Sequence, residues 1–243
     1  MKMKALVFNA SPNMEKGNTA LILNPFIEGM KEEGAEAELL YVRELKVNPC
    51  QGEQSCWTRT PGRCLQDDDM QDVYPKLQQA DIVVFATPVY VDGMTGALKN
   101  LVDRLIPTIQ PYTELREGHC RHPLRDGYKH AKAVLISTCG FWEMDNFSPL
   151  VMHMNAICQN ACWEYVGALL RPHSSALGYM LRKGQPVQDV IEAAKKAGRQ
   201  IIRNGEIDKK TISTVSRELV PLEAYVEILN RHFKKALDSL EKS

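Results

Sequence analysis

The chain is predicted to be an α/β protein, in which helices cover both faces of a parallel β-sheet. Two observations predict this class. Short apolar runs alternate with helix-like segments over the first 205 residues, and the run at residues 82–86 is apolar without a break. Strands buried on both faces have such unbroken runs of β-branched and aromatic residues. With 243 residues, the chain is long enough for one α/β unit with an additional segment.

Five segments have the length and composition of strands, and helical spacing of apolar residues separates them. The predicted strands cover residues 4–9, 37–42, 82–86, 133–137 and 165–170. The predicted helices cover residues 19–33, 70–79, 95–106, 149–162 and 187–203. Two stretches, 47–69 and 109–130, lack either period and contain several Pro, Gly and Cys residues, so they are expected to be irregular.

The C-terminal part of the chain differs from the alternating part. Residues 206–243 contain a charged connector and then an amphipathic helix. Its apolar residues recur every three or four positions: Leu222, Tyr225, Val226, Leu229, Phe233, Leu237 and Leu240. This face either packs on the same chain or contacts a second subunit. We therefore expect an α/β domain at 1–205 and a helical extension at 206–243, with a possible role in oligomerisation.

Composition excludes several classes of partner. Thirty Lys and Arg balance thirty Asp and Glu, so no nucleic-acid partner is expected. The apolar runs are much shorter than the roughly 20 residues that cross a bilayer, so no membrane partner is expected. The basic and apolar start of the chain is better explained as a first strand than as a signal peptide. Seven cysteines, an odd number, indicate free thiols and a cytoplasmic protein.

The loop after the first strand is a candidate phosphate site. Ligands of open α/β sheets bind beyond the carboxyl ends of the strands. This loop carries hydroxyl, amide and glycine groups immediately before a helix: Ser11, Asn13, Gly17, Asn18 and Thr19. Free N–H groups in the first turn of a helix attract a phosphate. Asn18 or Thr19 could instead only cap the helix. The loop lacks the spacing of Rossmann dinucleotide sites and of ATP-binding P-loops, so a different phosphate ligand is expected.

Two further loops are candidates for holding a flat ring. The loop after the third predicted strand offers Pro88, Val89, Tyr90, Asp92, Gly93 and Met94. Its N–H groups suit ring carbonyls and nitrogens, and Tyr90 or Met94 could contact the ring, although an ordinary strand–helix turn has similar residues. The loop after the fourth predicted strand begins with small residues, Thr138, Cys139 and Gly140, and continues with two aromatic residues.

Together these loops resemble a known family. The resemblance rests on Ala10-Ser11-Pro12 with Gly17-Asn18-Thr19, on Thr87-Pro88-Val89-Tyr90 with Gly93-Met94-x-Gly96-x-Leu98-Lys99-Asn100-x-x-Asp103-Arg104, and on Ser137-Thr138-Cys139-Gly140. These motifs resemble the NADPH-dependent FMN reductases of the flavodoxin-like superfamily, over residues 1–205. The resemblance implies a three-layer α/β/α sandwich with a five-stranded parallel sheet of order 2-1-3-4-5.

The resemblance also implies a ligand and an activity. FMN would bind with its phosphate at residues 11–19 and its ring at residues 88–94, and the turn at 138–140 would close the other side. NADPH or NADH would reduce the flavin, which would then reduce a small acceptor such as free flavin or a quinone. No catalytic side chain is predicted, because the flavin carries the chemistry. A homodimer or homotetramer is expected.

Two other classes of protein remain open. A flavodoxin-type carrier would exchange single electrons with protein partners, but the resemblance implies that such carriers are acidic, whereas this chain is neutral. A nucleotide-binding or interaction protein without enzymatic activity would use the same loops only for structure. Such a protein would be colourless.

The cysteines distinguish the chain from a neighbouring branch. The segment around Pro49 resembles the iron–sulfur flavoproteins, whose cluster motif has cysteines at two-residue gaps. Here Cys50, Cys56 and Cys64 are present, but Glu53 stands where another cysteine would be. A cubane cluster takes four thiolates, so no metal site is predicted, and an electron-transfer protein like the iron–sulfur flavoproteins is an alternative.

The remaining thiols and imidazoles are not predicted to form a site. Cys158 and Cys162 lie four residues apart on a predicted helix and are expected to be core residues. The run at 119–122 contains two His, one Cys and one Arg, but no second group of ligands stands at a suitable spacing.

Overall fold

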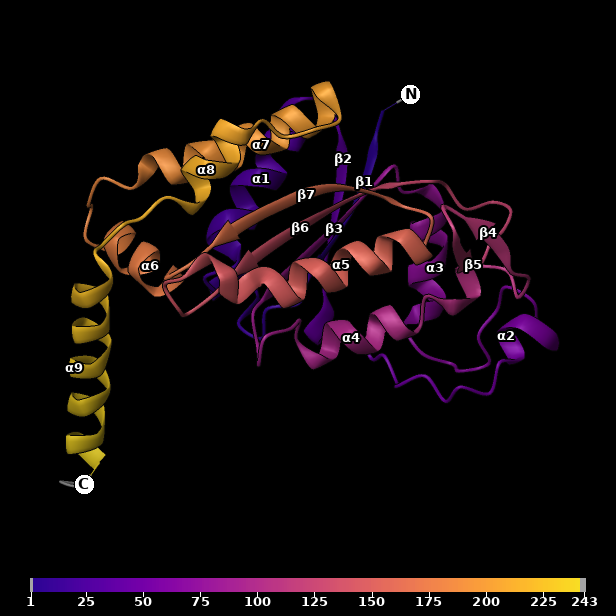
Figure 1. Cartoon of the computed structure of the whole chain (residues 1–243), viewed down its shortest axis with the longest axis horizontal. Helices are drawn as coiled ribbons and strands as arrows, with labels where there is room; N and C mark the ends of the chain where they lie inside the picture. Colours follow the sequence, from indigo (N-terminus) through magenta and orange to yellow (C-terminus); the bar gives the residue numbers. More distant parts are fainter. Residues whose placement is uncertain (1, 241–243) are drawn as a thin grey trace.

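A parallel sheet of five strands forms the middle layer of the structure, a computed structural model that describes residues 2–240 (Figure 1). Its strands are β1 (Lys4–Asn9), β2 (Glu36–Tyr41), β3 (Ile82–Pro88), β6 (Lys132–Thr138) and β7 (Glu164–Arg171). Their order is β2-β1-β3-β6-β7, with all pairs parallel. This confirms the predicted order, since β6 and β7 are the fourth and fifth strands of this sheet.

Helices cover both faces of the sheet, so the flavodoxin-like sandwich is confirmed. One face carries α1 (Ala20–Glu32), α6 (Ser174–Arg182), α7 (Gln188–Asn204) and α8 (Lys209–Ser216). The other carries α3 (Met70–Gln79), α4 (Gly96–Asp103) and α5 (Ser148–Asn160). Neighbouring residues of one strand point to opposite faces. Val7 accordingly packs in the first core and Phe8 in the second, and both are fully buried.

Several elements differ from the prediction. The segment predicted as irregular at 109–130 contains a hairpin, β4 (Glu114–Arg116) and β5 (His119–Arg121). Its strands are too short to show a period of two, but Gly118, which has a φ of +76°, marks the turn. The short helix α2 (Ser55–Thr58) and the helices α6 and α8 were not predicted. Cys158 is buried as expected, whereas Cys162 is only half-buried, which corrects that prediction.

The C-terminal helix α9 (Leu222–Leu240) leaves the sandwich. Figure 1 shows it running away from the sheet, so that the last turns of the helix lie far from the three layers. The last three residues of the predicted extension lie outside the described residues. No helix within residues 2–240 is both long enough and apolar enough to cross a membrane.

Two glycines allow α1 and α7 to pack closely. A Cβ atom added to Gly29 would lie 1.9 Å from the carbonyl oxygen of Lys195, and one added to Gly198 would lie 1.9 Å from that of Phe26. Both neighbours are backbone atoms, which cannot rotate away as a side chain can. Any larger residue therefore has to push the two helices apart.

We expect Gly198→Ala to lower the free energy of unfolding by about 3 kcal/mol, because the added methyl group overlaps the backbone of α1. Urea unfolding followed by circular dichroism measures this. Gly96→Ala is the matched control, since its added Cβ meets no atom within 4 Å. Equal stability of the two variants would contradict the close packing of α1 and α7.

Candidate functional site

The carboxyl ends of β1, β3, β6 and β7 are joined by backbone hydrogen bonds that extend beyond the strands. The N–H of Ala10 donates to the carbonyl of Ala86 at 2.7 Å, and the N–H of Val89 donates to that of Thr138 at 2.8 Å. The N–H of Cys139 continues the series to the next strand, β7. The three loops singled out from the sequence therefore meet at one edge of the sheet.

Buried hydroxyl groups hold these loops together. The Oγ1 atoms of Thr19 and Thr138 lie 2.9 Å apart, which joins the first loop to the third. Thr95 donates to the carbonyl of Ala10 at 3.2 Å and joins the second loop to the first. Ser137 donates to the carbonyl of Thr87 at 2.7 Å. Because each hydroxyl has a partner on another strand or loop, the relative positions of the loops are fixed.

Thr95 and Ser137 are site residues that the sequence analysis missed. Thr95 stands immediately before α4, and its side chain accepts from the N–H of Leu98, as an N-cap residue does. The Thr-Gly pair at the start of that helix is the signal that could have identified it. Ser137 lies within β6 and has no local signal, because its partner is on β3.

The loop at 11–19 has donor groups without partners in the described part of the chain. Ser11 is buried, and its hydroxyl makes no hydrogen bond to residues 2–240. The same holds for the backbone N–H groups of Asn18 and Thr19. A Cβ atom on Gly17 would lie 2.4 Å from the Ser11 Oγ and 3.3 Å from the Cβ of Asn13, so this position has no room for a side chain.

Helix capping does not explain this loop. Thr19 occupies the N-cap position of α1, but its side chain makes no capping hydrogen bond and is paired with Thr138 instead. The Nδ2 of Asn18 lies 3.4 Å from the Oγ of Ser174, at the start of α6. The first N–H groups of α1 itself donate to the carbonyls of residues 17–19, so the free N–H groups are those of Asn18 and Thr19, immediately before the helix. These attract an anion together with the positive end of the helix dipole.

The second loop forms a tight turn between Pro88 and Met94. Tyr90 and Gly93 exchange two backbone hydrogen bonds of 2.9 and 3.1 Å. Between them, Val91 and Asp92 have φ values of +46° and +62°, and Val91 is 99% exposed. A β-branched residue in this left-handed region is strained, and such strain is typical of functional loops.

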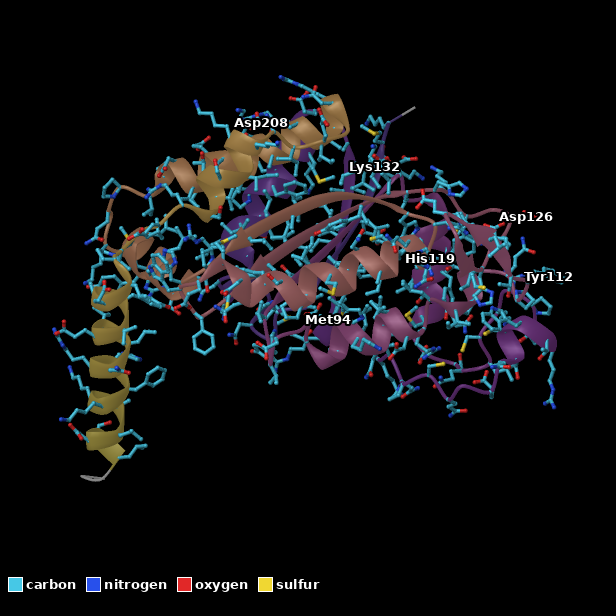
Figure 2. All side chains as sticks on the ribbon, viewed as in Figure 1. Met94, Tyr112, His119, Asp126, Lys132 and Asp208 are labelled. Atoms are coloured by element: carbon cyan, nitrogen blue, oxygen red, sulfur yellow. The ribbon has the colours of Figure 1, made fainter. Side chains whose placement is uncertain are left out.

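The side chains of this loop point in different directions. Tyr90 is half exposed, whereas Met94 is buried in the core beneath α3 and α4. Figure 2 shows Met94 on the α4 side of the sheet. Gly93 has no close neighbour on its side-chain position, since the nearest atoms are 4.0 Å from an added Cβ. The loop thus offers an open backbone surface and one exposed aromatic ring.

The third loop contacts the C-terminal extension. The hydroxyl of Tyr225, on the first turns of α9, donates to the carbonyl of Gly140 at 2.6 Å. The indole N–H of Trp142 donates to the carbonyl of Val220 at 2.9 Å. Burial raises the pKa of the Cys139 thiol, which therefore remains protonated at neutral pH. No local sequence signal predicted the contact of Tyr225 with this loop.

A buried histidine connects β7 to the extension. The Nε2 of His173 accepts from the N–H of Leu219 at 3.1 Å and from the Arg171 guanidinium at 2.9 Å. Its ring stacks on that of Trp142, with 5.9 Å between the ring centres. Burial, and then the positive charge of Arg171, lower the pKa of His173 to about 4. The imidazole is therefore neutral at pH 7 and accepts both hydrogen bonds.

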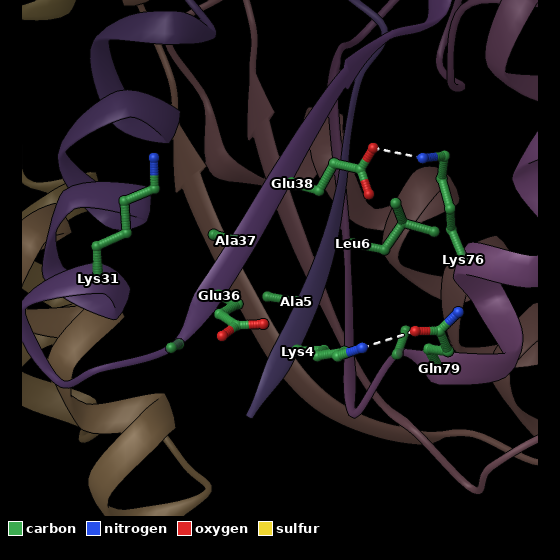
Figure 3. Close-up of a pocket in the computed structure, with 11 residues that line it drawn as sticks. Lys4, Ala5, Leu6, Lys31, Glu36, Ala37, Glu38, Lys76 and Gln79 are labelled. Carbon is green, nitrogen blue, oxygen red and sulfur yellow. Dashed lines mark hydrogen bonds and ion pairs between the residues drawn. The ribbon is translucent and has the colours of Figure 1, made fainter. Parts of the chain in front are cut away.

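Other hollows do not resemble this edge. The one in Figure 3 lies at the amino ends of β1 and β2, and two of its charged groups are paired with each other. Lys76 lies 2.6 Å from Glu38, and the Nζ of Lys4 donates to Gln79 at 2.6 Å. Parallel α/β sheets bind ligands at the carboxyl ends of their strands, whereas this hollow lies at the amino ends. We therefore interpret it as a surface groove between β2 and α3 and not as a ligand site.

The cysteines of the 47–69 segment line a cavity of about 400 Å³ on the α4 side of the fold. Cys50, Cys56 and Cys64 line it together with Glu53. The Nη2 of Arg104, whose guanidinium is paired with Asp68, also donates to the Cys64 Sγ at 3.3 Å. No group of three or more His, Cys, Asp or Glu side chains within residues 2–240 is placed to hold a metal ion.

We expect the stability of the fold to fall as the pH is lowered from 6.5 to 4. In this range the unfolded chain protonates the His173 imidazole and the folded chain does not, so folding loses up to about 3 kcal/mol. Urea midpoints measured across this range test it. His173→Gln is expected to flatten the dependence, whereas the exposed-residue control His130→Gln is expected to keep it. Identical slopes for all three proteins would contradict the buried neutral imidazole.

Comparison with known proteins agrees with this arrangement. Residues 3–120 match the family described as NADPH-dependent FMN reductase. An iron–sulfur flavoprotein of Archaeoglobus fulgidus is 40% identical over 102 residues, which are 42% of this chain and 48% of that protein. The chain thus spans about half the length of the curated relatives it matches.

Solved structures resemble a larger part of the chain. An NAD(P)H:quinone oxidoreductase from Methanothermobacter marburgensis gives a TM-score of 0.61 at 16% identity, over 83% of this chain and 96% of that one. An FMN-dependent NADH-azoreductase of Bacillus anthracis, in complex with FMN, gives 0.56 at 15% identity, over 83% and 100%. At such identities the likeness shows the fold alone. The chain therefore has the flavodoxin-like fold, and its residues 3–120 are related to the NADPH-dependent FMN reductases, as the sequence motifs indicate.

Proposed function

We propose that the chain binds FMN at the carboxyl edge of its sheet and works as an NAD(P)H-dependent FMN oxidoreductase. One observation carries this proposal. The hydroxyl of Ser11, which lies against Gly17, and the N–H groups of Asn18 and Thr19 at the start of α1 have no partner in the described part of the chain. Unpartnered donors at a helix N-terminus suit a phosphate ester.

The residues at this edge fit the rest of the cofactor. We propose that the phosphate is bound by Ser11, Asn13, Gly17, Asn18 and Thr19. The ring would be bound by Pro88, Val89, Tyr90, Asp92, Gly93 and Met94 on one side and by Thr138, Cys139 and Gly140 on the other. The donor groups are neutral, so the cofactor's own charge would be balanced by oriented N–H dipoles.

Bound FMN would supply the redox chemistry, taking a hydride from NADPH or NADH and delivering electrons to a small acceptor such as free flavin or a quinone. The chain's own part is to bind, orient and stabilise. The N–H groups of Val91 and Asp92 have no partner within residues 2–240 and belong to a turn that is already in place, so they would stabilise added negative charge without reorganising. The protonated Cys139 thiol does not act as a nucleophile.

The matched family and the relatives' names support this activity. We further propose a homo-oligomer that acts in the cytoplasm, with residues 1–205 as the FMN-binding domain and 206–243 as an extension. The seven unpaired cysteines support that location. The contact of Tyr225 with Gly140 supports a link between the extension and the FMN edge.

An iron–sulfur cluster does not fit the cysteine cavity. Three thiols line it, one fewer than a cubane cluster takes, and the guanidinium of Arg104 is already bonded to Cys64. Burial raises the pKa of the Cys56 thiol, which disfavours the thiolate that a metal needs. We therefore propose no electron transfer through a cluster in this chain, despite the similarity to iron–sulfur flavoproteins.

We expect the purified protein to be yellow and to bleach rapidly when NADPH or NADH is added without oxygen. Stopped-flow absorbance in the flavin band measures the bleaching. A yellow protein that bleaches only with dithionite would instead be a single-electron carrier. A colourless protein that binds no added FMN would contradict the proposal altogether.

We expect Ser11→Ala to weaken FMN binding by about 1–3 kcal/mol, because the phosphate loses a charge-assisted hydrogen bond from a buried donor. Titration of FMN fluorescence against the apoprotein measures the dissociation constant. Ser213→Ala is the matched control, since that hydroxyl is exposed on α8 and bonds only to the carbonyl of Lys210. Unchanged affinity in Ser11→Ala would remove this residue from the phosphate site.

A further inference from the structure

The arm formed by α9 leaves an apolar stripe uncovered. Its first turns are anchored through Tyr225, which is buried and bonded to Gly140. From Val226 to the end of the helix no residue is buried. We define the arm stripe as Val226, Leu229, Phe233, Ala236 and Leu237. Three of these side chains are clearly exposed: Val226 at 46%, Phe233 at 61% and Leu237 at 63%.

The stripe has the spacing of a helix–helix interface. Its positions 226, 229, 233 and 236 are separated by three, four and three residues, which is the a/d pattern of a coiled coil. The described chain offers no second helix alongside the arm, and Figure 1 shows it projecting away from the sandwich. An isolated helix of this length is marginal in water without packing on its apolar face.

The stripe is complementary to itself when two copies run antiparallel. A two-fold axis near residue 231 places Leu229 opposite Phe233 of the second copy, and Val226 opposite Ala236. Both pairs fit the same register, which places the two Leu229–Phe233 pairs at the centre of the contact and the smaller Val226–Ala236 pairs on either side of them. A parallel pairing would instead place Phe233 against Phe233 and Ala236 against Ala236.

The charges of the arm favour the same direction. The first half carries Glu223 and Glu227 without a basic residue. The second half, up to residue 240, carries Arg231, Lys234 and Lys235 with one acidic residue, Asp238. Antiparallel pairing places the acidic half of one copy along the basic half of the other, whereas parallel pairing places like charges together.

From these observations we infer that α9 is a dimerisation arm, which pairs antiparallel with α9 of a second copy of this chain. The axis near residue 231 brings the far end of the second arm to the level of Tyr225. The second copy then lies next to the turn at Gly140, beside the edge where the three loops meet. Such a two-fold contact is closed and yields a dimer rather than a filament.

Sedimentation velocity of the full chain tests the arm. The expected mass is twice the 27.4 kDa of one chain. The double variant Phe233→Glu with Leu237→Glu is expected to sediment as a single chain whose sandwich is still folded by circular dichroism, because both side chains are exposed on the arm. Part of the helical signal of the unpaired arm is expected to be lost. The matched control is Ile228→Glu, which is 54% exposed on another side of α9 and is expected to remain dimeric.

Cross-linking tests the direction. In a background with the exposed Cys50 and Cys120 replaced by serine, Val226→Cys and Ala236→Cys are prepared separately. We expect an intermolecular disulfide in the mixture of the two variants and none in either alone. A disulfide in each variant alone would overturn the antiparallel arrangement.

Three outcomes would overturn the proposal, two of them from sedimentation and one from flotation with lipid vesicles. They are a wild-type chain that is monomeric throughout the micromolar range, a double variant that stays dimeric, and a monomer that floats with phosphatidylcholine–phosphatidylglycerol vesicles. The last would show that the stripe binds a lipid surface. None of these readouts depends on bound flavin, so they test the arm independently of the proposed activity.

Discussion

The parallel alignment of β1, β3 and β6 is the constraint on which the rest of the structure depends. Each of these strands is buried on both faces, and the hydrogen bonds between them continue past their ends into the loops. The first, second and third loops therefore begin from one rigid edge. A single-residue slip between strands would move every side chain to the opposite face of the sheet, so the register is strongly specified.

Buried hydroxyl groups form hydrogen bonds that hold the three loops in fixed positions at this edge. Thr19, Thr95 and Ser137 each bond to a neighbouring strand or loop, and each is buried. A buried hydroxyl without a partner is costly, so these bonds lock the loops in one arrangement. Ser11 is the exception, because its hydroxyl has no partner among the described residues. Groups of this kind are preorganised for a ligand.

The neutral charge of the chain agrees with a site built from dipoles. The loops at the carboxyl edge present amides and hydroxyls, and one exposed arginine, Arg43, donates to the carbonyl of Pro12 in the first of them. Arg171 is fully buried and donates to the carbonyls of Pro172 and Val215. Burial lowers the pKa of Arg171 to about 10, so it stays protonated at neutral pH. Its role is to hold His173, and with it the extension, against the end of β7.

The sequence by itself determined the alternation of strands and helices, and the family resemblance supplied the order of the strands. Unbroken apolar runs and helical periods are local signals, which is why residues 82–86 and the helix at 70–79 were predicted well. The three candidate loops could be identified from the sequence because each of them directly follows a predicted strand. Only the tertiary structure decided which hydrogen-bonding groups of these loops have partners within the chain. The hydroxyl of Thr19, for example, is paired with that of Thr138, which lies 119 positions away in the sequence. It also decided that α9 projects from the sandwich, because an apolar stripe has the same spacing whatever covers it.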